Sequence, residues 1–217
     1  MSQNIRTDLK ILVVGYRGAG KTSFVKRWTK DEFKESYSLT IVSEFGFKIH
    51  ESNDKLYRIQ LWDIGGQDIS PTMAKIFARD SHGCVVLSDS TNIKALEDTL
   101  NWKNLVSQET NFIDGEKLPF ILVQNKIDLI ENREDFEKIE NETKTLCKDN
   151  NFEKYFMTSV KLNVNVEESM TFLIDKIIKR LEKYAESGNI VFNEQKQRNT
   201  ITVRNTSIRE NKKKNCC

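Results

Sequence analysis

A glycine-rich segment between an apolar run and a helix-like stretch constrains this sequence more than any other feature. The apolar run covers residues 9–14, the segment GYRGAGKT covers 15–22, and a helix is predicted to include 23–28. The glycines let backbone N–H groups close around a phosphate, and the helix start adds the positive end of its dipole. The order strand, loop, helix therefore predicts a P-loop and an α/β fold.

The side chains of this loop have separate expected roles. Lys21 is expected to contact the β and γ phosphates and assist catalysis, and the Thr22 hydroxyl to ligate Mg²⁺. Arg17 lies near the expected γ-phosphate, and we expect its side chain in solvent rather than on the transition state. A glycine-rich turn that binds nothing is the alternative, which the flanking strand and helix disfavour. The expected phosphate-binding residues are Gly15, Arg17, Gly18, Ala19, Gly20, Lys21, Thr22 and Ser23.

Apolar and alternating runs continue along the chain and indicate further strands. Including the run before the P-loop, they cover residues 9–14, 45–49, 56–62, 84–88, 120–123 and 155–157. Apolar residues also recur at helical spacing over 93–100 and 166–181, so helices are predicted between and after the later strands. We expect a six-stranded, mostly parallel sheet flanked by helices.

Composition excludes several classes of function. The 34 Lys and Arg nearly balance the 32 Asp and Glu, so no global positive field indicates a nucleic-acid partner. The longest apolar runs are far shorter than the roughly 20 residues of a membrane span. The sequence also has neither a CxxC pair nor a framework of spaced cysteines. We expect a cytoplasmic protein and a monomer.

Charge and hydropathy divide the chain in two. Residues 185–217 contain seven basic and three acidic residues, few apolar ones, and a C-terminal Cys-Cys pair. Such a segment buries too little surface to order itself. We predict one folded domain over 1–184 and a flexible, disordered tail over 185–217.

The segment WDIGGQ at 62–67 follows the third predicted strand. Asp63 can hold the water shell of a metal, the Gly66 N–H can meet a γ-phosphate, and Gln67 can orient an attacking water. On its own such a segment is more often a turn. After a P-loop, the catalytic interpretation is favoured.

The segment NKID at 125–128 follows the fifth predicted strand. The Asp128 carboxylate can accept two hydrogen bonds from a guanine base, which adenine does not offer. This predicts selection of guanine over adenine. The base-binding residues are expected to be Asn125, Lys126 and Asp128, completed by Ser159, Val160 and Lys161 of the segment TSVK.

With these motifs in this order, residues 10–181 resemble the Ras-like small GTPases, and within them the Rab family. The resemblance implies a GTPase that binds GTP, GDP and Mg²⁺. It implies Thr40 on the metal, Phe33 packed on the base and Tyr37 closing over the phosphates. It also implies three aromatic residues that present a nucleotide-sensitive surface to partners, namely Phe45, Trp62 and Phe77. The segments 114–119 and 152–161 and the Cys-Cys end resemble Rabs of lysosome-related organelles.

The resemblance also gives the tail a role. It implies geranylgeranylation of Cys216 and Cys217, which would hold the protein peripherally on the cytosolic face of intracellular membranes. Two lipid chains suit stable attachment, because a single chain anchors only weakly. The implied protein partners are an exchange factor, an activating protein and effectors.

Three functions are compatible with these residues. The favoured one is a Rab-like GTP/GDP switch that hydrolyses GTP slowly and recruits effectors in vesicle trafficking. A scaffold that holds nucleotide with impaired hydrolysis is the alternative, because Gly65 and Asp68 depart from the usual Rab pattern. A metabolic P-loop kinase is disfavoured, since no lid or acceptor segment is evident.

Overall fold

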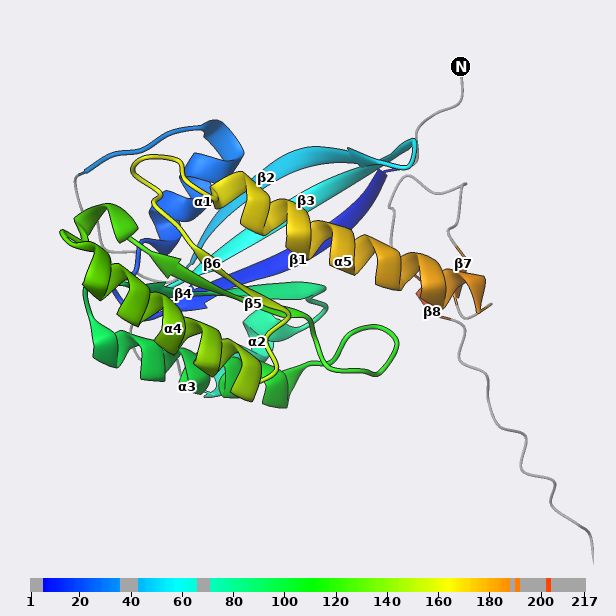
Figure 1. Ribbon diagram of the computed structural model, residues 1–217. Coiled ribbons are helices and arrows are strands. Elements are labelled where there is room, and N and C mark those ends of the chain that lie inside the picture. The colour runs from blue at the N-terminus through cyan, green and yellow to red at the C-terminus, as the bar shows by residue number, and fades with distance from the viewer. Residues whose placement is uncertain (1–5, 36–42, 66–70, 188–189, 192–201, 204–217) are drawn as a thin grey trace, which may run out of the picture.

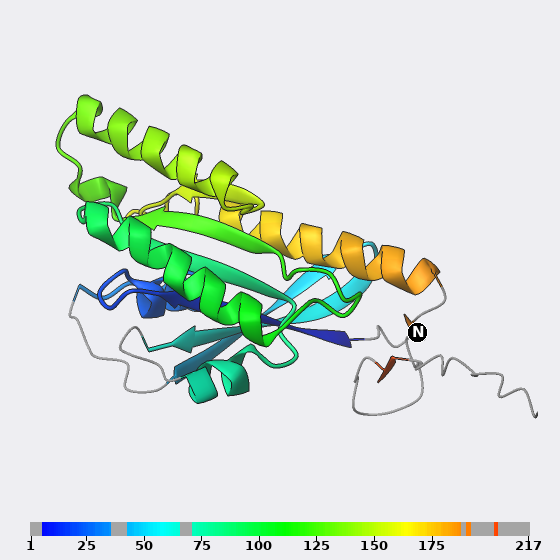
Figure 2. The ribbon, with the colours of Figure 1, turned by 90° about the horizontal axis from the view of Figure 1, so that it is seen from below.

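The computed structural model describes residues 6–35, 43–65, 71–187, 190–191 and 202–203, and it has a central sheet with helices on both faces (Figures 1 and 2). The strands of this sheet are β1 (Arg6–Gly15), β2 (Ser43–Ser52), β3 (Lys55–Ile64), β4 (Gly83–Asp89), β5 (Phe120–Asn125) and β6 (Lys154–Met157). The helices are α1 (Lys21–Lys30), α2 (Pro71–Ala78), α3 (Ile93–Glu109), α4 (Arg133–Asp149) and α5 (Val166–Glu186), with a 3₁₀ turn at Ile127–Leu129.

The strand order is β2-β3-β1-β4-β5-β6, and only β2 runs antiparallel to its neighbour. The prediction of a six-stranded, mostly parallel sheet flanked by helices is confirmed. Strands β2 and β3 form a hairpin closed by Asn53 and Asp54, whose φ angles of 51° and 58° suit a tight turn between twisted strands. Because the other strands are parallel, their carboxyl ends gather at one edge of the sheet, where ligands of such folds bind.

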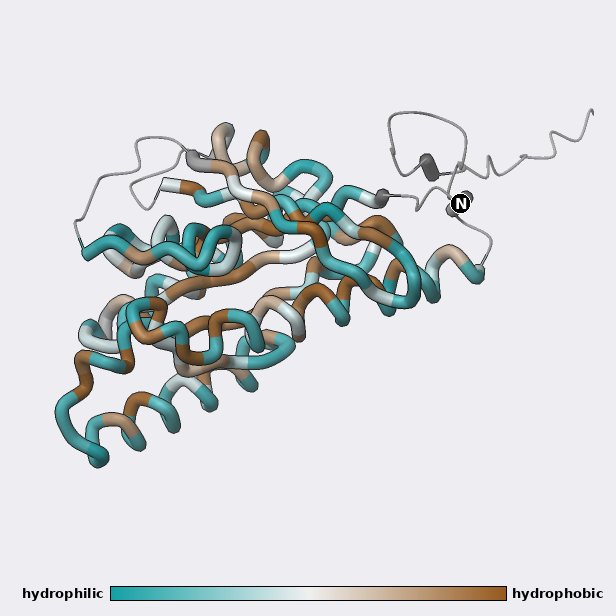
Figure 3. Tube along the Cα trace, turned by 90° about the horizontal axis from the view of Figure 1, so that it is seen from above, coloured by the Kyte–Doolittle hydropathy of each residue, from teal (hydrophilic) through white to brown (hydrophobic). Residues whose placement is uncertain are grey.

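The core lies on both sides of the central strands. Figure 3 shows apolar residues concentrated along these strands and polar ones toward the outer helices. Strand β5 is buried throughout, which explains its continuous apolar run. On α5, the apolar residues at helical spacing are all buried: Val166, Met170, Leu173, Ile174, Ile177 and Leu181. In the described part of the chain, no helix has both the length and the apolar character needed to cross a bilayer.

Helix α5 and two short strands lie across and beyond residue 184, the predicted end of the domain. Helix α5 continues through Glu186, two residues past the expected end at 184. Beyond it, the two-residue strands β7 (Ile190–Val191) and β8 (Thr202–Val203) pair with each other. Near the end of α5, Glu182 accepts hydrogen bonds from Asn53 at 3.5 Å and from Lys55 at 3.2 Å, which ties this helix to the β2–β3 hairpin. The division into 1–184 and 185–217 stays a prediction.

His82, just before β4, is held between two backbone groups of Lys10. Its Nδ1 accepts from the Lys10 N–H at 3.1 Å, and its own backbone N–H donates to the Lys10 carbonyl at 2.8 Å. Burial lowers the pKa of His82 to about 4. The charge of Lys10 acts in the same direction, while the charges of Asp80 and Asp8 and the hydrogen bond with the Lys10 backbone oppose it. The imidazole is therefore neutral in the folded protein at neutral pH.

This low pKa predicts acid sensitivity. Between pH 6.5 and 4 the unfolded chain binds a proton at His82 that the folded chain does not, so folding stability falls as pH falls. We expect this group to remove about 3 kcal/mol of the free energy of unfolding between pH 7 and pH 4. Urea unfolding of wild type and His82→Asn, which keeps an acceptor for the Lys10 N–H, measures the difference. Identical losses in both proteins would contradict the assignment.

Candidate nucleotide-binding site

The predicted P-loop connects β1 to α1 at the carboxyl edge of the sheet. Gly15, Gly18 and Gly20 all have positive φ angles, of 144°, 81° and 95°. At Gly15 a side chain is impossible without movement, because its Cβ would fall on the backbone carbonyl of Leu87 in β4. The loop thus turns at the last residue of β1 that pairs with β4, and α1 begins directly after it. Arg17 is exposed, and its solvation beside bound nucleotide stays a prediction.

Lys21, the first residue of α1, curls back over this loop. Its Nζ donates to the carbonyl oxygens of Gly15 and Tyr16, both at 3.0 Å, and the residue is only 6% exposed. Burial lowers the pKa of Lys21 to about 8, and the Asp63 carboxylate opposes this shift. A buried ammonium without full solvation favours an anionic ligand, and a phosphate chain would supply one.

Thr22 and Asp63 meet at the end of β3. The Thr22 hydroxyl donates to Asp63 Oδ2, and Asp63 is completely buried. A hydroxyl and a carboxylate oxygen are hard ligands of the kind Mg²⁺ prefers, so the two residues fit the predicted metal site. Tyr37, Thr40, Gly66 and Gln67 lie outside the described residues.

Asn125, at the end of β5, connects three segments that are far apart in the sequence. Its Nδ2 donates to the carbonyl of Ala19 in the P-loop at 2.9 Å. Its Oδ1 accepts from the backbone N–H of Val160 at 3.1 Å and from the Thr158 hydroxyl at 3.3 Å. Asn125 is 2% exposed, so these bonds are shielded from water. One amide therefore joins the predicted phosphate site to the predicted base site.

Asp128 is positioned by the segment after β6. The Ser159 hydroxyl donates to Asp128 Oδ1 at 2.5 Å and accepts from the backbone N–H of Leu162 at 3.0 Å. This arrangement fixes one carboxylate oxygen. In the described part of the chain, the other oxygen accepts no hydrogen bond. The geometry brings together the motifs at 125–128 and 158–161, as the sequence predicts.

Lys126 has a partner that sequence reasoning missed. Its Nζ pairs with Asp89 Oδ2 at 2.5 Å, and its backbone has a φ of 68°. Asp89 ends β4 and lies beside Asn125 in the strand register. An acidic residue at the carboxyl end of a neighbouring parallel strand was the available signal. The pair holds the Lys126 side chain at the rim of the site.

Arg27 links Phe33 to the segment after β6, because its side chain contacts both. The Arg27 guanidinium is 5.8 Å from the centroid of the Phe33 ring and donates from Nε to the Val160 carbonyl at 3.0 Å. Lys161 reaches the same chain segment through an ion pair with Glu35 at 2.5 Å. These contacts place the predicted base residues from two distant segments next to each other.

The three aromatic residues of the implied partner surface lie in two settings. Phe45 on β2 and Trp62 on β3 form an edge-to-face pair with centroids 5.8 Å apart, and Phe45 is 54% exposed. Phe77 on α2 is buried, with 8% exposure, and belongs to the core. The surface next to Phe45 also includes Phe47, with centroids 6.2 Å apart.

Comparison with known proteins agrees with this arrangement. Residues 10–179 match the model of the Ras family. The chain is 30% identical over 209 residues to Ras-related protein Rab-32 of Homo sapiens, covering 96% of this chain and 88% of that protein. It is 34% identical over 171 residues to human Ras-related protein Rab-7L1, covering 78% and 82%. It is 37% identical over 172 residues to Ras-related protein Rab-32A of Dictyostelium discoideum, covering 78% of each.

The family match covers residues 10–179 of the chain. In the structure, the P-loop, Asp63 and the segment 125–128 lie at the carboxyl ends of β1, β3 and β5, on one edge of the sheet. The chain therefore belongs to the Ras family and, within it, to the Rab small GTPases.

Proposed function

We propose that this GTPase is a GTP/GDP switch that hydrolyses GTP slowly and recruits effectors to the cytosolic face of intracellular membranes in vesicle trafficking. The observation that carries the proposal is Asn125, whose buried amide connects the P-loop to Val160 and Thr158. Asn125 thus connects the loop expected to bind the phosphates with the segment expected to bind the base. Such a connection suits a switch in which the presence of the γ-phosphate determines the conformation.

Hydrolysis in this proposal depends on positioning and charge neutralisation. The Lys21 ammonium and the P-loop N–H groups stabilise charge on the phosphates, and Gln67 orients the attacking water. Thr22 and Asp63, joined by Thr40, would hold Mg²⁺, which when bound neutralises phosphate charge. Without an activating protein we expect turnover on the order of 10⁻⁴ to 10⁻³ per second, as in related GTPases.

Recruitment follows from what the γ-phosphate holds in place. In the proposed GTP state, Thr40 and the Gly66 N–H are drawn toward the γ-phosphate, and the segments around them order against Phe45, Trp62 and Phe77. Hydrolysis removes these contacts, and the effector dissociates. Support comes from the exposed Phe45 ring, which packs edge-to-face on the half-buried Trp62, the neighbour on β3 of the proposed metal ligand Asp63.

Membrane attachment in this proposal depends on the end of the chain. Geranylgeranyl groups on Cys216 and Cys217 would provide two anchors, and three lysines at 212–214 would each add about 1 kcal/mol on an anionic leaflet. These residues lie outside the described residues, so the support is the sequence alone.

Nucleotide-dependent capture and single-turnover hydrolysis test the proposal together. We expect protein loaded with a non-hydrolysable GTP analogue to retain partners from a cytosolic extract that GDP-loaded protein does not. We also expect Gln67→Leu to hydrolyse bound GTP at least tenfold more slowly than wild type. Equal hydrolysis rates would favour the scaffold alternative. Identical captured proteins in both nucleotide states would contradict the switch.

A further inference from the structure

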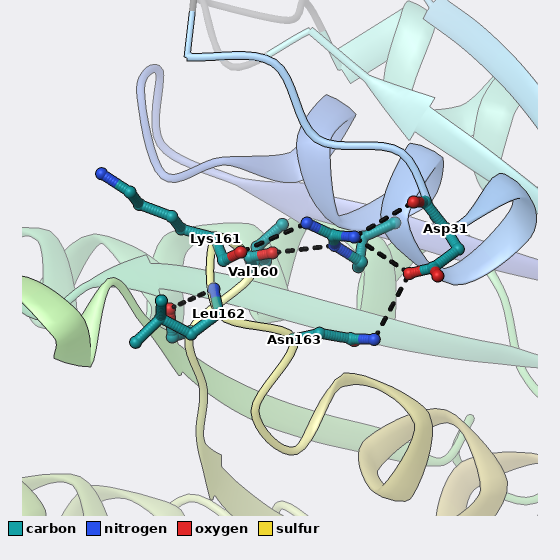
Figure 4. Close-up of polar contacts among 7 residues, drawn as sticks. Asp31, Val160, Lys161, Leu162 and Asn163 are labelled. Carbon is teal, nitrogen blue, oxygen red and sulfur yellow. Dashed lines mark hydrogen bonds and ion pairs between the residues drawn. The ribbon is translucent and has the colours of Figure 1, made fainter.

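One arginine on α1 joins the two segments that flank the proposed guanine site. The first segment is the base loop, defined here as residues 158–163. The Arg27 side chain, only 14% exposed, donates from Nε to the Val160 carbonyl at 3.0 Å and from Nη2 to the Lys161 carbonyl at 3.2 Å. Figure 4 shows both carbonyls turned toward these donors.

The same guanidinium also holds the chain that follows α1. Its Nη1 donates to the Asp31 backbone carbonyl at 3.1 Å and to Asp31 Oδ1 at 2.9 Å. Its centre lies 5.8 Å from the centroid of the Phe33 ring, within reach of a cation–π interaction. Arg27 therefore contacts the base loop and residues 31–33 at once.

Two weaker links join the same segments. Asn163 Nδ2 donates to Asp31 Oδ1 at 3.4 Å, as Figure 4 shows, and Lys161 Nζ pairs with Glu35 Oε1 at 2.5 Å. Glu35 and Lys161 are exposed, and an exposed ion pair contributes little because water and salt screen it. The partly shielded Arg27 side chain is thus the principal connection.

We propose that Arg27 is a positioning residue that keeps the base loop and the Phe33 segment closed on guanine, and so limits the rate of nucleotide release. The inference depends on the proposed function, since it assumes a guanine nucleotide between Phe33 and the base loop. For the base to leave, at least one of these segments has to move away. With Arg27 in place, that movement breaks charge-assisted hydrogen bonds to one segment or the other.

A lysine at this position would serve less well. The planar guanidinium directs Nε and Nη2 to two successive carbonyls while Nη1 faces Asp31. An ammonium on a flexible stem is a compact point charge that does not reproduce this fork. The proposal therefore predicts a graded series, in which Arg27→Lys releases nucleotide at a rate between those of wild type and Arg27→Ala.

The test measures release of a fluorescent GDP derivative from full-length protein. We expect Arg27→Ala to raise the dissociation rate about tenfold, Arg27→Lys to raise it less, and the association rate to change less than twofold. Arg133→Ala is the matched control, because Arg133 also forms an i,i+4 ion pair, with Glu137, but its side chain is exposed at the start of α4. We expect the control to release GDP at the wild-type rate.

A double-mutant cycle with Phe33→Leu separates positioning from general destabilisation. If Arg27 acts by holding Phe33 and the base loop together, the combined variant should release GDP more slowly than the product of the two single effects predicts. Additive effects, or an unchanged rate in folded Arg27→Ala and Arg27→Lys, would overturn the inference. Failure of wild-type protein to bind GDP at all would instead contradict the proposed function.

Discussion

Replacing Lys21 with methionine is expected to reduce the affinity for GDP and GTP by roughly 10²- to 10⁴-fold. The variant keeps the apolar stem and removes the ammonium, which is buried and directed into the P-loop by the carbonyls of Gly15 and Tyr16. Hydrogen bonds to charged groups contribute about 1.5–3 kcal/mol each, and two phosphates would accept them. Equilibrium titration with a fluorescent GDP derivative measures the change.

The control for this experiment lies on the same helix. Lys30 ends α1 and is exposed, so Lys30→Met should leave nucleotide affinity unchanged. Because Lys21 is buried at a cost that lowers its pKa, Lys21→Met should not greatly destabilise the nucleotide-free fold. A folded Lys21→Met variant with wild-type affinity would remove Lys21 from the phosphate site.

Gly15→Ala is expected to lower the free energy of unfolding by at least about 3 kcal/mol, or to prevent folding. Its Cβ would meet the backbone carbonyl of Leu87, which is fixed by the pairing of β1 with β4. Neither strand can yield without breaking that ladder. Urea unfolding followed by tryptophan fluorescence measures the loss, and the soluble fraction on expression reports variants that do not fold.

Gly18→Ala distinguishes steric overlap from backbone strain. Gly18 has a positive φ of 81°, but in the described part of the chain no atom outside Gly18 and its two chain neighbours lies within 4 Å of the Cβ position. We expect Gly18→Ala to lower the free energy of unfolding by only about 1–2 kcal/mol, which is the cost of holding an alanine in the left-handed backbone conformation. Similar losses in the two variants would mean that the contact with Leu87 does not determine the need for glycine at position 15.

The sheet and the site motifs were accessible from the sequence because each has a local signal. Alternation over 45–49 and 56–62 predicted the strands β2 and β3, and the spacing of apolar residues predicted α5. Each of the three motifs, the P-loop and the segments 62–67 and 125–128, was predicted to lie at the end of a strand. Parallel pairing then brings those ends to one edge.

Helix α4 was given no residue range in the prediction, because its apolar signal is weak. Of its 17 residues, the buried ones are Ile139, Thr143 and Cys147, and most of the remainder are charged or polar. A start signal was present, since Asn132 caps the helix by accepting from the Asp135 N–H at 2.8 Å. Helix α2 was also absent from the prediction and has eight residues.

The roles of Arg27 and Asp89 depend on contacts between distant segments. Arg27 donates to carbonyls 133 and 134 residues away. Every residue has a backbone carbonyl, so the identity of the accepting residues gives no sequence signal for these contacts. The site roles predicted from the sequence stay predictions, and six of those residues lie outside the described residues: Tyr37, Thr40, Gly66, Gln67, Cys216 and Cys217.

The contact between Glu182 and the β2–β3 hairpin fixes where the chain leaves the domain. Helix α5 ends next to the hairpin turn at residues 53–54, whereas the P-loop lies at the opposite end of the strands (Figure 1). A support attached to the end of α5 would therefore meet the domain at the end opposite its nucleotide site (Figure 1). Surface-based binding experiments can use that attachment point without masking the entrance to the site.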